Sequence, residues 1–99
     1  MCGAPAQDLS VEGIDVAAET VIQGTVTRGG QPEGGAYVRL LDSSGEFTAE
    51  VVTSPEGVFR FFAAPGSWTL RALSRLGNGD LAVDVTRGVN EVALSVAAA

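Results

Sequence analysis

One aromatic-rich stretch, residues 57–70, constrains the fold of this 99-residue chain more than any other feature. It holds three of the four phenylalanines and the single tryptophan. Phe59 and Phe61 occupy alternate positions, and so do Trp68 and Leu70 after a Pro-Gly pair. A period of two places such side chains on one face of a strand, and Pro-Gly favours a turn. The stretch therefore predicts a hairpin whose aromatic rings fill the core of a β-sandwich.

The rest of the chain repeats this strand pattern. Short alternating segments are separated by Gly, Pro, Ser and Asn at intervals of about eight to twelve residues, which is typical of an antiparallel sandwich or barrel. We predict an all-β domain, a seven-stranded antiparallel β-sandwich over residues 20–99, preceded by an acidic arm over residues 1–19 whose order the sequence leaves open. The expected strands are 21–28, 36–42, 47–53, 58–63, 67–75, 81–86 and 89–96, with a loop at 29–35 and a turn at 77–79.

Charge and composition exclude several classes of function. The net charge is −6, with six arginines and no lysine, so the chain lacks the basic stripe of a nucleic-acid binder. No stretch approaches the roughly 20 apolar residues of a membrane span. The absence of histidine removes the commonest general base and metal ligand, and the carboxylates match no calcium-loop spacing. We therefore expect no catalytic residue, no enzyme activity, no metal, no cofactor, no nucleic acid and no membrane partner.

Cys2 is the only strong nucleophile of the chain. A single cysteine cannot form an internal disulfide, and no apolar run of signal-peptide length is present, so we expect a soluble cytoplasmic protein. Removal of Met1 would place a terminal ammonium beside the thiol and favour the thiolate. Such a thiol can accept sulfur as a persulfide. The alternative is that Cys2 is idle.

A second candidate is a surface. If Phe59 and Leu70 face inward, Arg60, Phe62 and Arg71 face outward. In the same way, inward Val38 and Leu40 would turn Tyr37 and Arg39 outward. Arg and aromatic residues are enriched at protein interfaces, so the surface would bind a protein partner or, in a homodimer, a second copy; the alternative is ordinary cross-strand pairing. If their strands are neighbours, the exposed face comprises Tyr37, Arg39, Arg60, Phe62 and Arg71, with Glu50 as an ionic partner.

Four short motifs resemble the carboxypeptidase regulatory-like domain, a seven-stranded transthyretin-like (prealbumin-like) sandwich. That resemblance covers about residues 20–96 and implies the fold rather than a function. Related hydroxyisourate hydrolases depend on histidine, so their activity is not expected here. The motifs are Ile22-x-Gly24-x-Val26, Gly34-Gly35-Ala36-x-Val38-x-Leu40, Gly57-x-Phe59-x-Phe61 and Ala64-Pro65-Gly66-x-Trp68-x-Leu70.

A further set of stretches consists of Met1-Cys2 and the runs 34–36, 38–42, 46–52 and 59–73, which together make up most of the chain. In these stretches the chain resembles a family of small actinobacterial proteins of unknown function. Members of that family are linked by gene neighbourhood to a rhodanese-type thiosulfate sulfurtransferase. The resemblance implies a non-catalytic accessory protein of sulfur metabolism that binds this enzyme and accepts sulfur on Cys2. The alternative is a structural or protein-interaction module without covalent chemistry.

Overall fold

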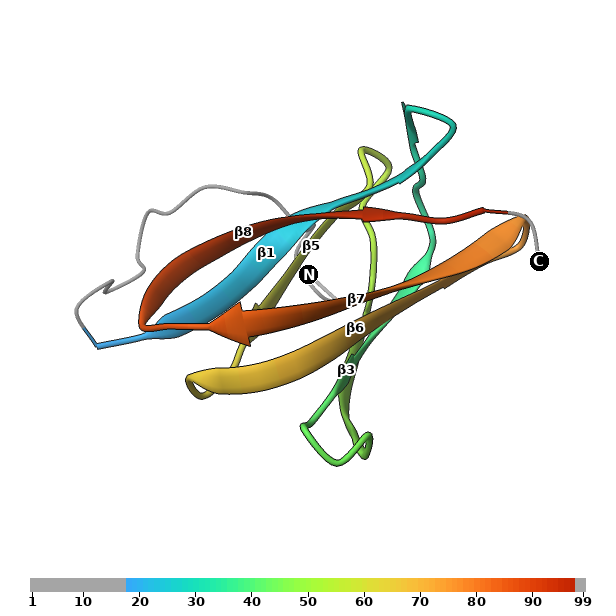
Figure 1. The fold of residues 1–99 in the computed structure, drawn as a ribbon. Coiled ribbons are helices and arrows are strands. Elements are labelled where there is room, and N and C mark those ends of the chain that lie inside the picture. The colour runs from blue at the N-terminus through green and yellow to red at the C-terminus, as the bar shows by residue number, and fades with distance from the viewer. Residues whose placement is uncertain (1–17, 98–99) are drawn as a thin grey trace, which may run out of the picture.

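The computed structural model describes residues 18–97, and every regular element within them is a β-strand (Figure 1). Turns that contain glycine, proline or serine separate most of the strands, as the sequence predicted. The strands are β1 (Thr20–Arg28), β2 (Gln31–Pro32), β3 (Tyr37–Leu41), β4 (Phe47–Val52), β5 (Val58–Phe62), β6 (Gly66–Ser74), β7 (Gly77–Val85) and β8 (Gly88–Ser95).

The strands form two sheets that pack face to face. In the β1 sheet, β1 lies between β8 on one side and β5 on the other, with the two-residue β2 beside its end. The β3 sheet has the order β4-β3-β6-β7. Figure 1 shows β8 running along β1 and β7 running along β6. The predicted all-β sandwich is confirmed, with β2 as an additional short strand inside the expected loop.

One strand pair departs from the antiparallel pattern. β8 runs parallel to β1 over eight paired positions, from Thr20–Gly88 to Thr27–Ser95, and all other pairs of strands are antiparallel. The chain reaches β8 from β7, which belongs to the other sheet. A hairpin would make β8 antiparallel to the strand before it in the same sheet. Because the chain crosses between layers instead, β8 can run parallel to β1. Alternation along a strand predicts which face is buried but not the direction of its partner.

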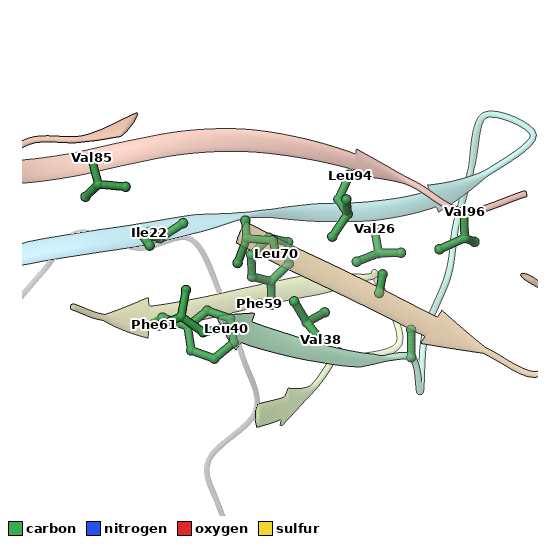
Figure 2. Packing of buried hydrophobic residues seen from close by; sticks show 12 residues of the cluster. Ile22, Val26, Val38, Leu40, Phe59, Phe61, Leu70, Val85, Leu94 and Val96 are labelled. Atoms are coloured by element: carbon green, nitrogen blue, oxygen red, sulfur yellow. The ribbon is translucent and has the colours of Figure 1, made fainter. Parts of the chain in front are cut away.

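The core lies between the two sheets and is centred on the aromatic stretch. Phe59 and Phe61 enter it from β5, with ring centroids 6.1 Å apart and ring planes tilted by 59°. Figure 2 shows them meeting Leu40 and Leu70 from the opposite layer. Full burial of each such side chain contributes about 1.5 to 3 kcal/mol. The buried cluster comprises Ile22, Val26, Ala36, Val38, Leu40, Phe59, Phe61, Leu70, Ala72, Val85, Leu94 and Val96.

The predicted central hairpin is wrong, because β5 and β6 belong to different sheets. The segment around Pro65 crosses from one layer to the other instead of joining two paired strands. The indole Nε1 of Trp68 donates a hydrogen bond of 2.8 Å to the carbonyl of Ala64 and ties this crossing to β6. Strands that face each other across a core carry the same inward alternation as hairpin partners, so the pattern fits both arrangements.

The turn predicted at residues 77–79 is also wrong, since these residues begin β7 and the turn lies at 75–76. Gly77 and Gly79 allow a close approach of the end of β8 and of the chain that follows it. A Cβ at Gly79 would lie 1.9 Å from the carbonyl oxygen of Ser95. Asn78 and Ala97 form two backbone hydrogen bonds of 3.0 Å beside it. The glycines therefore serve contact between the sheets rather than a turn.

Candidate functional site

The five residues predicted to form one surface lie on two opposite faces of the sandwich. Tyr37, Arg39 and Arg71 are on the outer face of the β3 sheet, because β3 and β6 are neighbours. Arg60 and Phe62 are on β5 and therefore on the outer face of the β1 sheet. The prediction of one surface required all these strands to be neighbours, and they are not. The core separates the three residues on the β3 sheet from the two on β5.

A row of four charged residues crosses the outer face of the β3 sheet. Arg39 and Arg71 lie side by side in register. Arg39 Nε is 2.7 Å from Glu50 Oε2, and Arg71 Nε is 3.1 Å from Asp80 Oδ1. The expected role of Glu50 as an ionic partner is confirmed for Arg39. Exposed ion pairs of this kind contribute less than about 1 kcal/mol each, so their main effect is to place a neutralising carboxylate beside each guanidinium group.

An apolar row lies next to the charged row. Val52, Tyr37 and Leu73 are cross-strand neighbours on β4, β3 and β6. Tyr37 is 51% exposed and Val52 is 47% exposed. The row thus places an exposed aromatic ring and an exposed aliphatic side chain beside two arginines, a composition enriched at protein interfaces. We call these two rows the Tyr37 face: Tyr37, Arg39, Glu50, Val52, Arg71, Leu73 and Asp80.

A groove lies at the end of the Tyr37 face, where the loop before β3 meets the β6–β7 turn. It has a volume of about 300 Å³, and a shallower hollow beside it extends to Tyr37 and Leu73. Leu76 is 56% exposed at its rim. The sequence analysis missed Leu76 because it placed the turn two residues later. The groove is lined by Glu33, Gly34, Gly35, Ser74, Arg75 and Leu76.

The outer face of the β1 sheet carries a polar chain of its own. Arg60 Nε donates to Gln23 Oε1 at 2.9 Å, and Gln23 Nε2 donates to Glu91 Oε1 at 3.1 Å. Gln23 is fully buried, whereas Phe62 on the same face is 59% exposed. Gln23 was not predicted, and its only signal was a long polar side chain at an outward position of β1.

Asp42 organises the turn between β3 and β4. Its Oδ1 accepts hydrogen bonds from the hydroxyl of Ser44 at 2.6 Å and from the backbone N–H groups of Ser44 and Glu46. The Ser44 hydroxyl, followed by the Glu46 N–H, lowers the pKa of this exposed carboxyl below its usual value of 3.8. The arrangement stabilises a turn and offers no acid–base group for catalysis.

Two further kinds of feature, a metal site and a membrane-spanning helix, were considered for residues 18–97. Within them, no three acidic or sulfur side chains approach closely enough to hold a metal ion. In the same range no helix has the length and apolar character needed to cross a bilayer. Cys2 and most of the predicted acidic arm lie outside the described residues.

Comparison with known proteins gives matches along nearly the whole chain. The model of a family described as "Protein of unknown function (DUF1416)" matches residues 2–96. Two Mycobacterium tuberculosis proteins, "Uncharacterized protein Rv0814c" and "Uncharacterized protein Rv3118", are each 59% identical over 99 residues, covering 97% of this chain and 99% of theirs. An uncharacterized protein of Mycolicibacterium smegmatis is 61% identical over 87 residues, covering 86% of this chain and 97% of its own.

A solved structure has a similar fold. It is a DUF3823 family protein from Parabacteroides merdae, with a TM-score of 0.62 and 22% sequence identity. The match covers 81% of this chain and 46% of the other, so this chain spans about half the length of that protein. At this level of identity the likeness concerns the fold alone.

Proposed function

The chain belongs to the DUF1416 family of proteins of unknown function, and from its structure we propose that it is a non-catalytic module that binds another protein. The observation that carries this proposal is the Tyr37 face, where an exposed tyrosine and an exposed valine adjoin two arginines. Tyr and Arg are the residues over-represented among those that dominate binding energy at interfaces.

The geometry of the Tyr37 face supports binding to a protein surface. Each arginine is held by a carboxylate on the neighbouring strand, so little side-chain entropy remains to be lost on binding. The adjoining groove offers space for a partner side chain next to Leu76. The face is carried by paired strands, which keep its side chains in fixed register.

We propose further that the partner is a rhodanese-type thiosulfate sulfurtransferase of the cytoplasm. The support is the resemblance to actinobacterial proteins linked to that enzyme by gene neighbourhood. In this proposal the Cys2 thiolate attacks the terminal sulfur of a persulfide on the enzyme's cysteine. The enzyme's sulfur–sulfur bond breaks, its cysteine leaves as a thiolate, and a persulfide forms on Cys2. Sulfur changes carrier without net oxidation.

The second candidate function is a protein-interaction module in which Cys2 takes no part. The Tyr37 face supports it equally, because that face contains no nucleophile. Its occupant would be a partner protein or a second copy of this chain. Intact mass separates the two functions. After incubation with a thiosulfate sulfurtransferase and thiosulfate, the first gives one added sulfur atom that reductant removes and that Cys2→Ser abolishes. Unchanged mass, or loading retained in Cys2→Ser, would leave the second.

Binding itself is tested by isothermal titration of the sulfurtransferase with the wild-type protein and surface variants. We expect Tyr37→Ala and Arg71→Ala to weaken binding about tenfold or more, because truncating a central interface residue costs about 2 to 4 kcal/mol and about 1.4 kcal/mol is a factor of ten. Arg60→Ala, on the opposite face, is the matched control and should bind like the wild type. Equal affinity in all the variants would overturn the assignment of the Tyr37 face.

A further inference from the structure

The outer face of the β1 sheet has a centre from which solvent is excluded. Ile22 points into the core, so its neighbours Val21 and Gln23 point away from it. Both are nevertheless fully buried. A residue on the outer side of a sheet has strands to its left and right but no layer of the sandwich above it. Full burial at these two positions therefore indicates that something covers the centre of this face.

The chemistry of the face defines what fits on it. Phe62, Val21 and Val89 form an apolar row across β5, β1 and β8. The next row consists of Arg60, Gln23 and Glu91, and Arg60 supplies the positive charge in it. A suitable occupant is thus an extended segment that combines aliphatic side chains with carboxylates.

We infer that this occupant is the chain's own segment of residues 1–17. The segment contains three carboxylates and no basic residue, so its charge complements Arg60. It also contains aliphatic residues that suit the apolar row. The carboxylates are Asp8, Glu12 and Asp15, and the aliphatic residues are Leu9, Val11, Ile14 and Val16.

Length and point of attachment agree with this assignment. Only Ala18 and Glu19 separate the segment from Thr20, the first residue of β1, and Val21 follows Thr20. Seventeen extended residues span roughly 55 Å, whereas the longest dimension of the molecule is 38 Å. The segment is therefore long enough to cross the face. Because the contact is intramolecular, its effective concentration is in the millimolar range and modest affinity is sufficient.

The inference does not depend on the identity of any partner. It assigns the two faces of the sandwich to different occupants: the N-terminal segment covers the β1 sheet, and the Tyr37 face stays open. It also means that Cys2 is carried by a segment that is anchored on the sandwich. Failure of partner binding through Tyr37 would leave this assignment untouched, and the reverse also holds.

Hydrogen–deuterium exchange of the full-length protein tests the inference. Peptides from residues 8–16 should exchange at least about tenfold more slowly than the same peptides in urea-unfolded protein, after correction for urea's effect on the intrinsic exchange rate, because docking shields their amides. Arg60→Glu should remove most of this protection by repelling the carboxylates. Arg71→Glu, the same change on the opposite face, should leave it intact.

A second variant distinguishes loss of docking from misfolding of the sandwich caused by Arg60→Glu. The triple change Asp8→Asn, Glu12→Gln and Asp15→Asn alters no residue of the two sheets and should reduce protection as Arg60→Glu does. Exchange at the unfolded rate in the wild type would overturn the inference. So would equal protection in Arg60→Glu and Arg71→Glu. Protection of the face that increases with protein concentration, together with a dimeric mass, would assign the face to a second copy instead.

Discussion

At the scale of single residues, close approach between backbones decides which positions must be glycine. Gly79 is the sharpest case, because an added Cβ would meet the carbonyl oxygen of Ser95 at 1.9 Å. We expect Gly79→Ala to destabilise the protein by about 1 to 3 kcal/mol or more, the range for overpacking. The change forces β7 away from the end of β8. Urea denaturation followed by tryptophan fluorescence measures this free energy of unfolding.

Gly30→Ala provides the matched control. Gly30 has a φ of 83° and open space around its Cα, so alanine there meets only the cost of a left-handed backbone, about 1 kcal/mol. If Gly79→Ala were no more destabilising than Gly30→Ala, the contact between β7 and the end of β8 would not be as tight as described.

Asp42, in the β3–β4 turn, makes the stability of the fold depend on pH. Its pKa is lowered in the folded protein, chiefly by the Ser44 hydroxyl, so the charged carboxylate stabilises the fold. This stabilisation is complete above the usual pKa of 3.8, which applies to the unfolded chain, and is lost as the pH falls through the lower folded value. We expect wild type to be more stable than Asp42→Asn at pH 7, with the difference vanishing at low pH. Denaturant titrations between pH 7 and pH 2 would show it.

The Ser44→Ala variant checks the cause. Without the hydroxyl donor, the pKa of Asp42 should rise toward its usual value, which NMR titration of the carboxyl carbon detects. A pKa that stays unchanged in Ser44→Ala would contradict the role given to this hydrogen bond.

Some contacts on the surface could be predicted from the types of residue at outward positions, and others could not. Glu50 was predicted as an ionic partner within a set of outward arginine and aromatic residues, and the structure pairs it with Arg39. Leu76 was missed, since the sequence signal for a turn favoured the glycines after it. Gln23 was missed because a side chain at an outward position of a strand is normally exposed to solvent. Its burial depends on tertiary structure, which the alternation of residues along one strand does not report.

At the scale of elements, the alternation of apolar residues located most strands but not the sheet to which each belongs. β5 and β6 have matching inward faces, and they meet across the core rather than side by side. A hairpin and a crossing both bury the same side chains, so the pattern does not distinguish them. The assignment of Arg60 and Arg71 to one predicted surface failed for this reason, since the two strands turn their outer sides in opposite directions.

The loop before β3 depends on one buried hydroxyl at the end of β4. Thr53 Oγ1 accepts a hydrogen bond from the N–H of Ala36 at 2.9 Å and donates one to the carbonyl of Glu33 at 2.7 Å. Thr53→Val keeps the shape but leaves both groups without this partner. We expect a loss of about 1 to 3 kcal/mol in stability, the cost of a buried unsatisfied donor, measured by chemical denaturation.

Thr48→Val is the control for this prediction. Thr48 is exposed on β4, where such a change alters stability by less than about 0.5 kcal/mol. Because the same loop lines the groove beside the Tyr37 face, Thr53→Val should also increase amide exchange in residues 33–36. Equal stability of the two valine variants would show that the loop is held by other contacts.

At the scale of the whole molecule, the fold is closed by contacts between the two ends of the described chain. Gln23 and Glu91 are hydrogen-bonded although 68 positions separate them in sequence. The sequence predicted that a sandwich forms, because periodicity and turn composition are local signals. It did not predict that the first and last strands pair in parallel, because that pairing depends on how many times the chain crosses between layers.

This topology predicts slow folding. The pairing of β1 with β8 closes a loop of nearly the whole domain. The chain entropy lost in this closure comes before the stabilising contacts of the pair form. We expect refolding from urea in milliseconds to seconds, the range for sandwiches rich in distant contacts. Stopped-flow fluorescence of Trp68, the only tryptophan, reports the reaction directly. Leu94→Ala, which truncates a core side chain of β8, should slow refolding if that pairing forms in the rate-limiting step, whereas Asp42→Asn should not. Relaxation in microseconds would contradict control of folding by this long-range closure.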